Sequence, residues 1–297
     1  MDTLQLKLFI SLAQNLSFTK TANDFFMTQP TVSNQIKALE KDLGVKLFNR
    51  DSRSVSLTTE GKEFLGYAEQ ILTLQIMAET RLRNISDGRC GYIHIAMLSS
   101  HSELFSRCLT EFSTRFSDVQ TDVDMIEGEE MVRAITHNSH DLYFLNNYML
   151  PDNDKIVSRI TGTDRLHIFA HKSVADKIDM NDWSTINGMR FVSVPEMDFV
   201  LSSRIKKICM KNGIVQDTIN YYNRAATLLL AVNSNIGLAV LPLSVASFNH
   251  FNDVVAIPIP DEEAVIQTAV AWHKDNTNAD VEHFLSLNVL KNTFVKG

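Results

Sequence analysis

The feature that most constrains this chain is a short helix pattern near its amino terminus, apolar on one face and uncharged or positive on the other. Residues 27–39 contain no carboxylate, and Val32, Ile36, Leu39 and Leu43 recur at spacings of four, three and four residues. That spacing places the apolar side chains on one face of an α-helix. The opposite face is short, polar and cationic, and we expect it to contact DNA.

The polar residues of this helix suit two kinds of DNA contact. Side chains in its middle are able to exchange hydrogen bonds with base edges, and backbone N–H groups at its amino end favour phosphate. Further along, residues 45–48 and 54–57 have the pattern of two short strands, with Arg50 and Arg53 in the turn between them. The predicted DNA-binding residues are Thr28, Gln29, Pro30, Thr31, Ser33, Asn34, Lys37, Arg50 and Arg53.

The flanking residues predict a winged helix-turn-helix over residues 1–58. An amphipathic first helix precedes Ser17, which is placed to cap a second helix. Pro30 falls in the first turn of the third helix, where its missing N–H costs nothing. Gly44 is expected to end that helix, and the two strands with their arginine-bearing turn form the wing.

This segment resembles the LysR-type transcriptional regulator family. Thr21 and Phe25 depart from the family's usual alanine and leucine, and both are expected in the core of the second helix. The resemblance implies a sequence-specific DNA-binding regulator. The matching residues, all in one register, are Phe18, Thr19, Ala22, Gln29, Pro30, Val32, Ser33, Gln35, Ile36, Leu39, Glu40, Leu43, Gly44, Leu47, Phe48, Arg50, Leu57, Thr58 and Gly61.

The charge of the chain is unevenly distributed. Residues 1–60 hold seven basic and six acidic groups, a balance of +1, so the net charge of −7 leaves −8 for the rest of the chain. The acidity therefore belongs to a second module. A balance of +1 is weak for a protein that binds DNA, so affinity is expected to depend on dimerisation and on a few well-placed contacts.

The segment after the wing predicts one long helix, assigned to a linker over residues 59–90. It contains no proline, and Gly88 is placed to cap its end. Two interpretations stay open: a coiled-coil seam, which the four-three spacing favours, or a helix packed on its own domain. The resemblance implies that this helix holds a homodimer, and further suggests a homotetramer. The seam residues are Phe64, Ala68, Ile71, Gln75, Ala78, Leu82 and Ile85.

Residues 91–297 alternate between strand and helix patterns, which predicts an α/β domain of mostly parallel sheets with helices on both faces. Their pattern resembles the two-lobed, periplasmic-binding-protein-like effector domain of the same family. We expect crossings near residues 161–163 and 263–264, which divide the domain into lobe I (92–162 and 265–297) and lobe II (163–264). The last helix is expected over residues 281–290.

One turn of this domain departs from the family pattern. Asn235 stands where the family usually has glycine, in the best-matched stretch of residues 231–242. Asparagine tolerates a left-handed helix end better than other residues with a side chain, so we expect the turn to survive.

A cleft between two such lobes binds ligands at the carboxyl ends of strands, where helix amino termini point inward. Ser99 and Ser100 follow the first strand of the domain, and their hydroxyl groups with nearby free N–H groups predict an anion site. The same serines would equally serve as a helix cap. We therefore expect a small-molecule effector, with a carboxylate favoured, bound by Ser99, Ser100, His101, Glu129, Asn146, Ser202 and Thr227.

Other functions find little support in the sequence. It contains no nucleophile elbow, phosphate loop, dinucleotide fingerprint or zinc-protease motif, so we expect neither an enzyme nor a cofactor. Glu127, Glu129 and Glu130 fit a solvated strand end and first helical turn. His137 and His140 form the only close histidine pair and fit a solvated helix end, and the three cysteines lie far apart, so no metal site is expected.

Two alternatives to a ligand-responsive regulator fit the sequence less well. A solute-binding transport component would explain the lobes but would need an export signal and would have no use for residues 1–60. An architectural DNA protein would need strong basicity throughout. We expect a cytoplasmic protein, with no membrane segment, whose partners are double-stranded DNA with a dyad-symmetric site, the effector, further copies of itself and, as an additional candidate, RNA polymerase.

Overall fold

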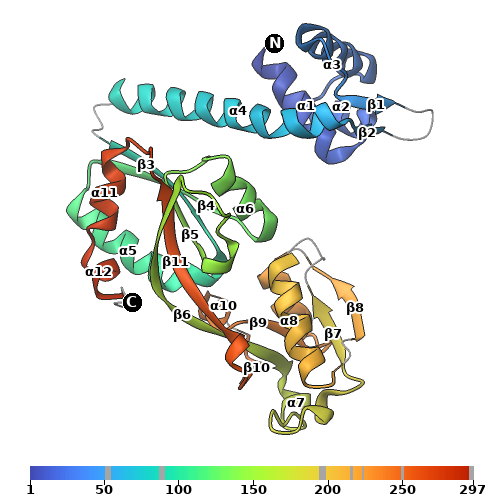
Figure 1. Ribbon diagram of the computed structural model, residues 1–297, viewed down its shortest axis with the longest axis vertical. Helices are drawn as coiled ribbons and strands as arrows, with labels where there is room; N and C mark the ends of the chain where they lie inside the picture. The colour runs from blue at the N-terminus through green and yellow to red at the C-terminus, as the bar shows by residue number, and fades with distance from the viewer. Residues whose placement is uncertain are drawn as a thin grey trace. The chain divides into compact units, whose positions relative to one another are not determined.

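The computed structural model describes residues 1–50, 55–86, 91–193, 199–214, 217–222, 224–248 and 251–293. The chain forms two compact units, Met1–Gly88 with His137–Ser139, and Arg89–Thr136 with His140–Gly297 (Figure 1). Among the described helices, none combines the length and the apolar character that crossing a membrane would require.

The first unit is built on three short helices, α1 (Thr3–Asn15), α2 (Phe18–Asp24) and α3 (Gln29–Leu43). Each begins at a side-chain cap, from Asp2, Ser17 and Thr28 respectively, because their oxygen atoms accept N–H groups that the first turn leaves unpaired. Their apolar faces meet in one core of fully or nearly fully buried side chains, which contains Leu6, Leu8, Phe9, Leu12, Ala22, Val32, Ile36, Leu39, Leu47, Phe48 and Ala68. The helix-turn-helix prediction is confirmed.

The wing differs from the prediction in the position of its first strand. Strand β1 (Phe48–Arg50) pairs antiparallel with β2 (Val55–Leu57), so it begins where residues 45–48 were expected to end. The reason is that the Glu40 carboxylate, on α3, accepts the N–H groups of Leu47 (2.9 Å) and Phe48 (3.2 Å). This contact turns the chain around the end of α3 before the strand starts. Arg53, expected at the tip, lies outside the described residues, and Arg50 belongs to β1.

The long helix is confirmed as α4 (Thr59–Ser86), and the packing of its apolar residues differs along its length. Ala68 is fully buried and Phe64 packs beside it in the core of the first unit. Ile71 and Leu82, by contrast, are 37% and 68% exposed. The first two seam residues, Phe64 and Ala68, therefore pack in the core of the first unit, and the exposed apolar residues of the expected seam begin at Ile71.

The second unit begins with a parallel arrangement of three strands. Strand β3 (Gly91–Met97) lies between β4 (Val119–Met125) and β5 (Leu142–Asn146), and the connections are the helices α5 (Ser102–Arg115) and α6 (Gly128–Thr136). Their packed side chains form a core on each face, with Phe105, Phe112, Phe144 and Phe284 on the α5 side. Helix–strand alternation was predicted here, and it is confirmed.

Two long strands extend this sheet and make it mixed rather than mostly parallel. Strands β6 (Ile156–His171) and β11 (Val265–His273) pair antiparallel with each other, and β11 also pairs antiparallel with β5. Strand β6 continues without interruption through residues 161–163, where a crossing was expected, and it is paired with β11 there (Figure 1). The prediction of mostly parallel sheets is wrong because these crossing strands run opposite to their neighbours.

The far half of β6 organises the remaining part of the sheet. It pairs with β9 (Ala239–Pro242) and β10 (Val254–Pro258), and a separate parallel pair, β7 (Arg190–Ser193) with β8 (Asp217–Tyr221), lies next to β9. Helices α8 (Phe199–Lys211) and α9 (Ala225–Asn233) complete this part. The shorter elements are η1 (Ser99–His101), η2 (Asn147–Met149), α7 (Lys172–Ala175), η3 (Trp183–Ile186), α10 (Val245–Phe248) and η4 (Glu262–Ala264).

Two helix ends test the local expectations. Asn235 has φ of 54°, so the left-handed turn predicted after α9 is confirmed. The single closing helix expected over residues 281–290 is instead two helices, α11 (Ala279–Leu285) and α12 (Asn288–Thr293). The break is stabilised because the Glu111 carboxylate accepts the N–H groups of Asn288 (2.9 Å) and Val289 (3.0 Å) at the start of α12.

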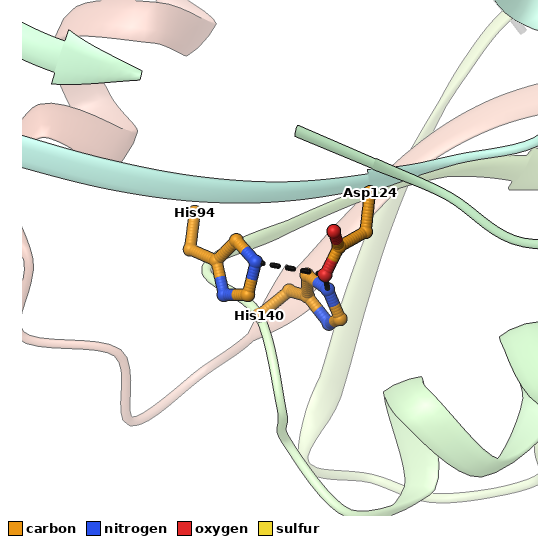
Figure 2. A group of neighbouring side chains, drawn as sticks. All are labelled: His94, Asp124 and His140. Atoms are coloured by element: carbon orange, nitrogen blue, oxygen red, sulfur yellow. Dashed lines mark hydrogen bonds and ion pairs between the residues drawn. The ribbon is translucent and has the colours of Figure 1, made fainter. Parts of the chain in front are cut away.

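One histidine of the close pair contradicts its predicted environment. His140 lies between α6 and β5 and is 7% exposed, where a solvated helix end was expected. Its ring points toward the Asp124 carboxylate, with Nε2 3.1 Å from Oδ2 (Figure 2). The sequence spacing of His137 and His140 did not indicate this, because the packing partner comes from a different strand.

Candidate functional site

The polar face of α3 is free to meet a partner. Thr28, Gln29, Pro30, Thr31, Asn34 and Lys37 are exposed and Ser33 is half-buried, while Val32, Ile36 and Leu39 on the opposite face are fully buried. Thr28 begins the helix: its Oγ1 accepts the Thr31 N–H and lies 2.8 Å from Thr31 Oγ1. The helix thus presents its amino end and one polar side, which is the arrangement that reads base edges in a major groove.

A residue missed by the sequence reasoning lies beside this face. Phe26, in the turn between α2 and α3, has φ of 53° and is 98% exposed. Exposure of a whole phenylalanine at a turn is unfavourable in water, and an apolar side chain near a base edge is able to contact a thymine methyl group. Its only sequence signal was an apolar residue two positions before the Thr28 cap.

The second unit contains a cleft with a cavity of about 280 Å³. One wall comes from the ends of β3 and β5 and the start of α6, and the other from α8, α9, β9 and α10. This is the position predicted for an effector. The lining residues are Leu98, Ser99, Ser100, Glu127, Gly128, Glu129, Glu130, Arg133, Asn146, Tyr148, Met149, Leu201, Arg224, Ala225, Leu241, Pro242 and Val245.

Several buried polar atoms at this cleft have no partner in the described part of the chain. These are Ser99 Oγ and Asn146 Oδ1, whose residues line the cavity, and Nε2 of His101, which is buried close by. A buried polar atom left without a hydrogen bond costs about 1–3 kcal/mol. The Asn146 amide and the His101 ring also interact with each other, so the Ser99 hydroxyl is the atom of this group that most favours a polar ligand.

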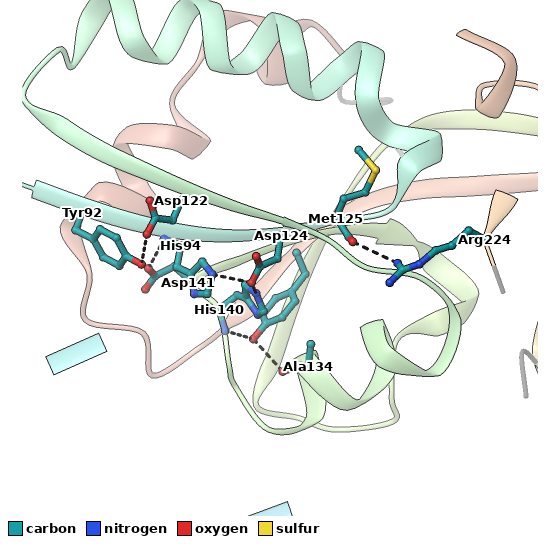
Figure 3. Close-up of polar contacts among 10 residues, drawn as sticks. Tyr92, His94, Asp122, Asp124, Met125, Ala134, His140, Asp141 and Arg224 are labelled. Atoms are coloured by element: carbon teal, nitrogen blue, oxygen red, sulfur yellow. Dashed lines mark hydrogen bonds and ion pairs between the residues drawn. The ribbon is translucent and has the colours of Figure 1, made fainter. Parts of the chain in front are cut away.

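The charged residues of the cleft were only partly foreseen. Arg224, at the start of α9, donates from its Nη1 to the Met125 carbonyl at 3.4 Å (Figure 3). Its Nη2 lies 3.7 Å from the Glu130 carboxylate. Arg133 lies 3.8 Å from Glu129 in the same helix. Both guanidinium groups are about half exposed, so a bound anion would be able to compete for them.

The predicted anion site at free N–H groups after Ser100 is wrong. The Glu127 carboxylate accepts the Ser99 N–H at 3.0 Å, and the N–H groups of His101 and Ser102 go to the carbonyls of Leu98 and Ser99. Glu127 was expected at a solvated strand end, but it lines the cleft and holds the backbone of Ser99 in place through this hydrogen bond. Negative charge therefore already satisfies the position that was assigned to an effector carboxylate.

Of the seven predicted effector residues, four line the cavity, two lie outside its lining, and the seventh, His101, is buried behind its wall. Ser99, Ser100, Glu129 and Asn146 line the cavity, whereas Ser202 and Thr227 lie outside the lining. Ser202 follows Leu201, which does line it, and the Thr227 hydroxyl donates to the carbonyl of Arg224 at 2.7 Å. The sequence correctly predicted that α8 and α9 border the cleft, but it did not predict which residues of each helix face the cavity.

His101 occupies a special position behind the cavity wall. Its ring is 3% exposed and lies edge-on to Phe144, with centroids 6.4 Å apart. Burial lowers the pKa of His101 to about 4, although Asn146 and the charge of Asp164 oppose the shift. The ring is therefore neutral at physiological pH and holds a polar nitrogen against the back of the cleft.

Two family models match this chain and together cover both units. The model described as "Bacterial regulatory helix-turn-helix protein, lysR family" matches residues 4–62, and the "LysR substrate binding domain" matches residues 86–288. The chain belongs to the LysR family. It is a DNA-binding transcriptional regulator with an effector-binding domain, and not an enzyme.

Curated relatives agree along almost the whole length of this LysR-family chain. It is 26% identical to the HTH-type transcriptional regulator BudR of Raoultella terrigena, over 97% of this chain and 100% of that protein. It is 25% identical to the uncharacterized HTH-type transcriptional regulator YnfL of Escherichia coli (strain K12), over 96% of each.

Solved structures share the fold. The crystal structure of CbnR, a LysR family transcriptional regulator, superposes with a TM-score of 0.69 at 19% identity, covering 99% of this chain and 100% of that one. Full-length CbnR complexed with its target DNA gives a TM-score of 0.54 at 20% identity, over 99% of each chain. The order of winged helix, long helix and two-lobed domain is therefore that of known regulators.

Proposed function

We propose that this regulator binds a dyad-symmetric DNA site as a homo-oligomer held together through α4, and that a small carboxylate-bearing metabolite in the cleft modulates this binding. The observation that carries the effector part is the buried, unpaired hydroxyl of Ser99 in the cavity wall. At about 280 Å³ the cavity is near the lower limit of ligand pockets, which span roughly 300–1,000 Å³, so the effector is a small molecule.

Recognition of DNA is assigned to the exposed face of α3. We assign Ser33, Asn34 and Lys37 to base edges in the major groove. We assign Arg50 and Arg53 to the backbone or the minor groove from their positions in the sequence. The buried stripe of Val32, Ile36 and Leu39 supports this orientation, since it leaves only one face of the helix available. The complex of the relative CbnR with its target DNA supports a DNA-bound state for the same fold.

Asn34→Ala is expected to reduce discrimination between the specific promoter site and random DNA. A good base contact contributes about 1–3 kcal/mol of discrimination, or roughly 5- to 150-fold in relative affinity. Arg53→Ala is the matched comparison, because loss of a backbone contact weakens binding to all sequences and flattens its salt dependence. Fluorescence anisotropy on both DNAs measures this. Equal discrimination by Asn34→Ala and the parent would contradict the proposed docking.

Self-association is assigned to the exposed apolar part of α4. Ile71 and Leu82 lie on the four-three face that continues beyond the core of the first unit, and Leu74 next to that face is 64% exposed. Exposed apolar side chains in a stripe favour a partner of the same kind. A second α4 supplies such a face, and a two-fold dimer presents two reading helices to a dyad-symmetric site.

Ile71→Asp is expected to dissociate the homo-oligomer, because the new carboxylate would be buried without a partner in the paired helices. Ile76→Asp is the matched control: Ile76 is 57% exposed on the same helix but lies off the four-three face. Light scattering should show a smaller species only for Ile71→Asp. If both variants keep the parent's mass, α4 does not hold the oligomer by this face.

The carboxylate character of the effector rests on Arg133 and Arg224. Three glutamates also line the cavity, and each has a nearby group: Ser99 N–H for Glu127, Arg133 for Glu129 and Arg224 for Glu130. The two long ion pairs leave the guanidinium groups open to a second carboxylate. Donors on the effector would then pair with Ser99 Oγ and Asn146 Oδ1.

Ser99→Ala is expected to weaken the effector while leaving the effector-free protein as stable as before, or more so, because it deletes an unpaired buried hydroxyl. Loss of one such hydrogen bond corresponds to about 1–3 kcal/mol, or 5- to 150-fold in affinity. Thermal shift with a panel of small carboxylates, matched amides and matched amines measures it, with Ser202→Ala as the control outside the cavity lining.

The panel separates the parts of the effector proposal. Stabilisation by carboxylates that Ser99→Ala reduces and Ser202→Ala keeps supports it. Stabilisation by amines alone would contradict the proposal that the effector carries a carboxylate. An unchanged response of Ser99→Ala would contradict the proposal that the effector binds in the cleft. Promoter binding with and without the stabilising compound then tests whether the effector prefers one DNA-binding state, which modulation requires.

A further inference from the structure

Two histidines and one aspartate converge on lobe I from three separate elements. His94 lies on β3, Asp124 on the neighbouring strand β4, and His140 between α6 and β5. Both histidine Nε2 atoms approach the same oxygen, Asp124 Oδ2, at 3.0 Å and 3.1 Å (Figure 2). Their rings are tilted by 35° with centroids 4.0 Å apart. One donor atom from each of the three residues lies within 4.8 Å of the others.

The spacing of these atoms fits a metal ion with short bonds. Bonds of about 2.0–2.1 Å to a tetrahedral Zn²⁺ hold neighbouring ligand atoms roughly 3.3 Å apart. The two measured nitrogen–oxygen separations are a few tenths of an ångström shorter, so small rotations of the side chains would admit the ion. Imidazole nitrogens with one carboxylate oxygen are donors that suit zinc and related transition metals, and alkaline-earth ions less well.

The surroundings hold the two histidines in place by their backbones. The His94 N–H donates to the Asp141 carboxylate at 2.9 Å, and the His140 N–H donates to the Tyr143 hydroxyl at 2.8 Å. That hydroxyl in turn donates to the Ala134 carbonyl in α6 (Figure 3). Fixed supports of this kind preorganise metal ligands.

The local charge also favours a cation. Asp122 lies two residues before Asp124 on β4, where it accepts the Tyr92 hydroxyl at 3.0 Å, and Asp141 follows His140 directly. An ionised carboxylate beside a neutral imidazole is the state that binds metal.

We propose that His94, Asp124 and His140 form a binding site for a divalent transition-metal ion, best matched by Zn²⁺, with the remaining coordination position open to water. The site lies apart from the lining of the effector cleft: Asp124 lies on β4, whereas the lining residues that follow this strand begin after its end, at Glu127, and continue into α6. The simpler alternative is a hydrogen-bonded network in which the carboxylate only bridges two imidazoles. That network would exist without affinity for zinc.

The test is a calorimetric titration of the full chain with ZnCl₂ at neutral pH, after a chelator has removed bound metal. The parent should bind one Zn²⁺ per chain at this site. His94→Gln, His140→Gln and Asp124→Asn should each weaken it at least about 100-fold, since even outer-shell changes cost 10- to 100-fold. Asp124→Asn keeps the size of a half-exposed side chain, so it preserves the fold, and His171→Gln is the control at a histidine outside the cluster.

Two further measurements define the class of ion. Excess Mg²⁺ or Ca²⁺ should not displace Zn²⁺, because hard cations prefer sites made of oxygen ligands alone. Affinity should also fall in acid, since protons compete with the metal for the imidazole nitrogens. The proposal is overturned if the parent shows no saturable zinc binding, if the three variants bind zinc like the parent, or if Mg²⁺ or Ca²⁺ competes equally.

Discussion

Gly61→Ala is expected to destabilise the DNA-binding domain by about 2–3 kcal/mol or more, although glycine to alanine in a helix normally gains up to about 1 kcal/mol. Gly61 lies in the first turn of α4, and a Cβ there would stand only 2.1 Å from the carbonyl oxygen of Leu47. That oxygen already accepts the Thr58 N–H at 3.0 Å. Backbone has to move, and the packing of α4 against the wing moves with it.

Gly44→Ala is the matched control in the same domain. Gly44 ends α3 with φ of 73°, and a Cβ there would point into open space, so the cost is backbone strain alone, about 1–2 kcal/mol. Far-UV circular dichroism and promoter binding report on the loss. Tryptophan fluorescence should stay unchanged, because Trp183 and Trp272 are both in the effector domain. Parent-like stability of Gly61→Ala would show that the contact relaxes freely.

The DNA-binding unit was predictable because its information is local. The spacing of Val32, Ile36 and Leu39 predicts the buried face of α3. Thr28 and Gly44 indicate its two ends, because their capping preferences act within one helical turn. The exact start of β1 was not predictable, since it depends on Glu40 reaching forward to Leu47 and Phe48. This contact depends on how the end of α3 lies relative to β1, and the spacing of apolar residues does not predict that arrangement.

The effector domain shows the same division between local and long-range information. Periodicity found most helices and strands, but strand direction was missed where β6 and β11 cross, because pairing direction is a property of the topology. The cleft residues that sequence reasoning missed, among them Arg224 and Glu127, come from elements far apart along the chain. His94, Asp124 and His140 are similarly separated, so no spacing rule for metal ligands detects them.

The effector domain is expected to lose stability in mild acid because of His101. The pKa of this buried ring is about 4 in the folded state and about 6.5 when unfolded. A depressed folded pKa contributes stability that is fully present above 6.5 and is lost as pH falls toward 4, because only the unfolded state takes up the proton in that window. The full linkage is about 3 kcal/mol, of which about 2 kcal/mol is lost between pH 8 and pH 5.

Two substitutions separate titration from packing at this position. His101→Gln keeps a polar group and His101→Phe fills the site with an apolar ring, so their stabilities at pH 8 should differ. Neither side chain takes up a proton, so both should lose about 2 kcal/mol less than the parent between pH 8 and pH 5. Urea unfolding followed by the fluorescence of Trp183 and Trp272 isolates this domain. A parent-like pH dependence in both variants would assign the acid sensitivity to other groups, and the neutral His101 ring would then be only a packing element behind the effector cleft.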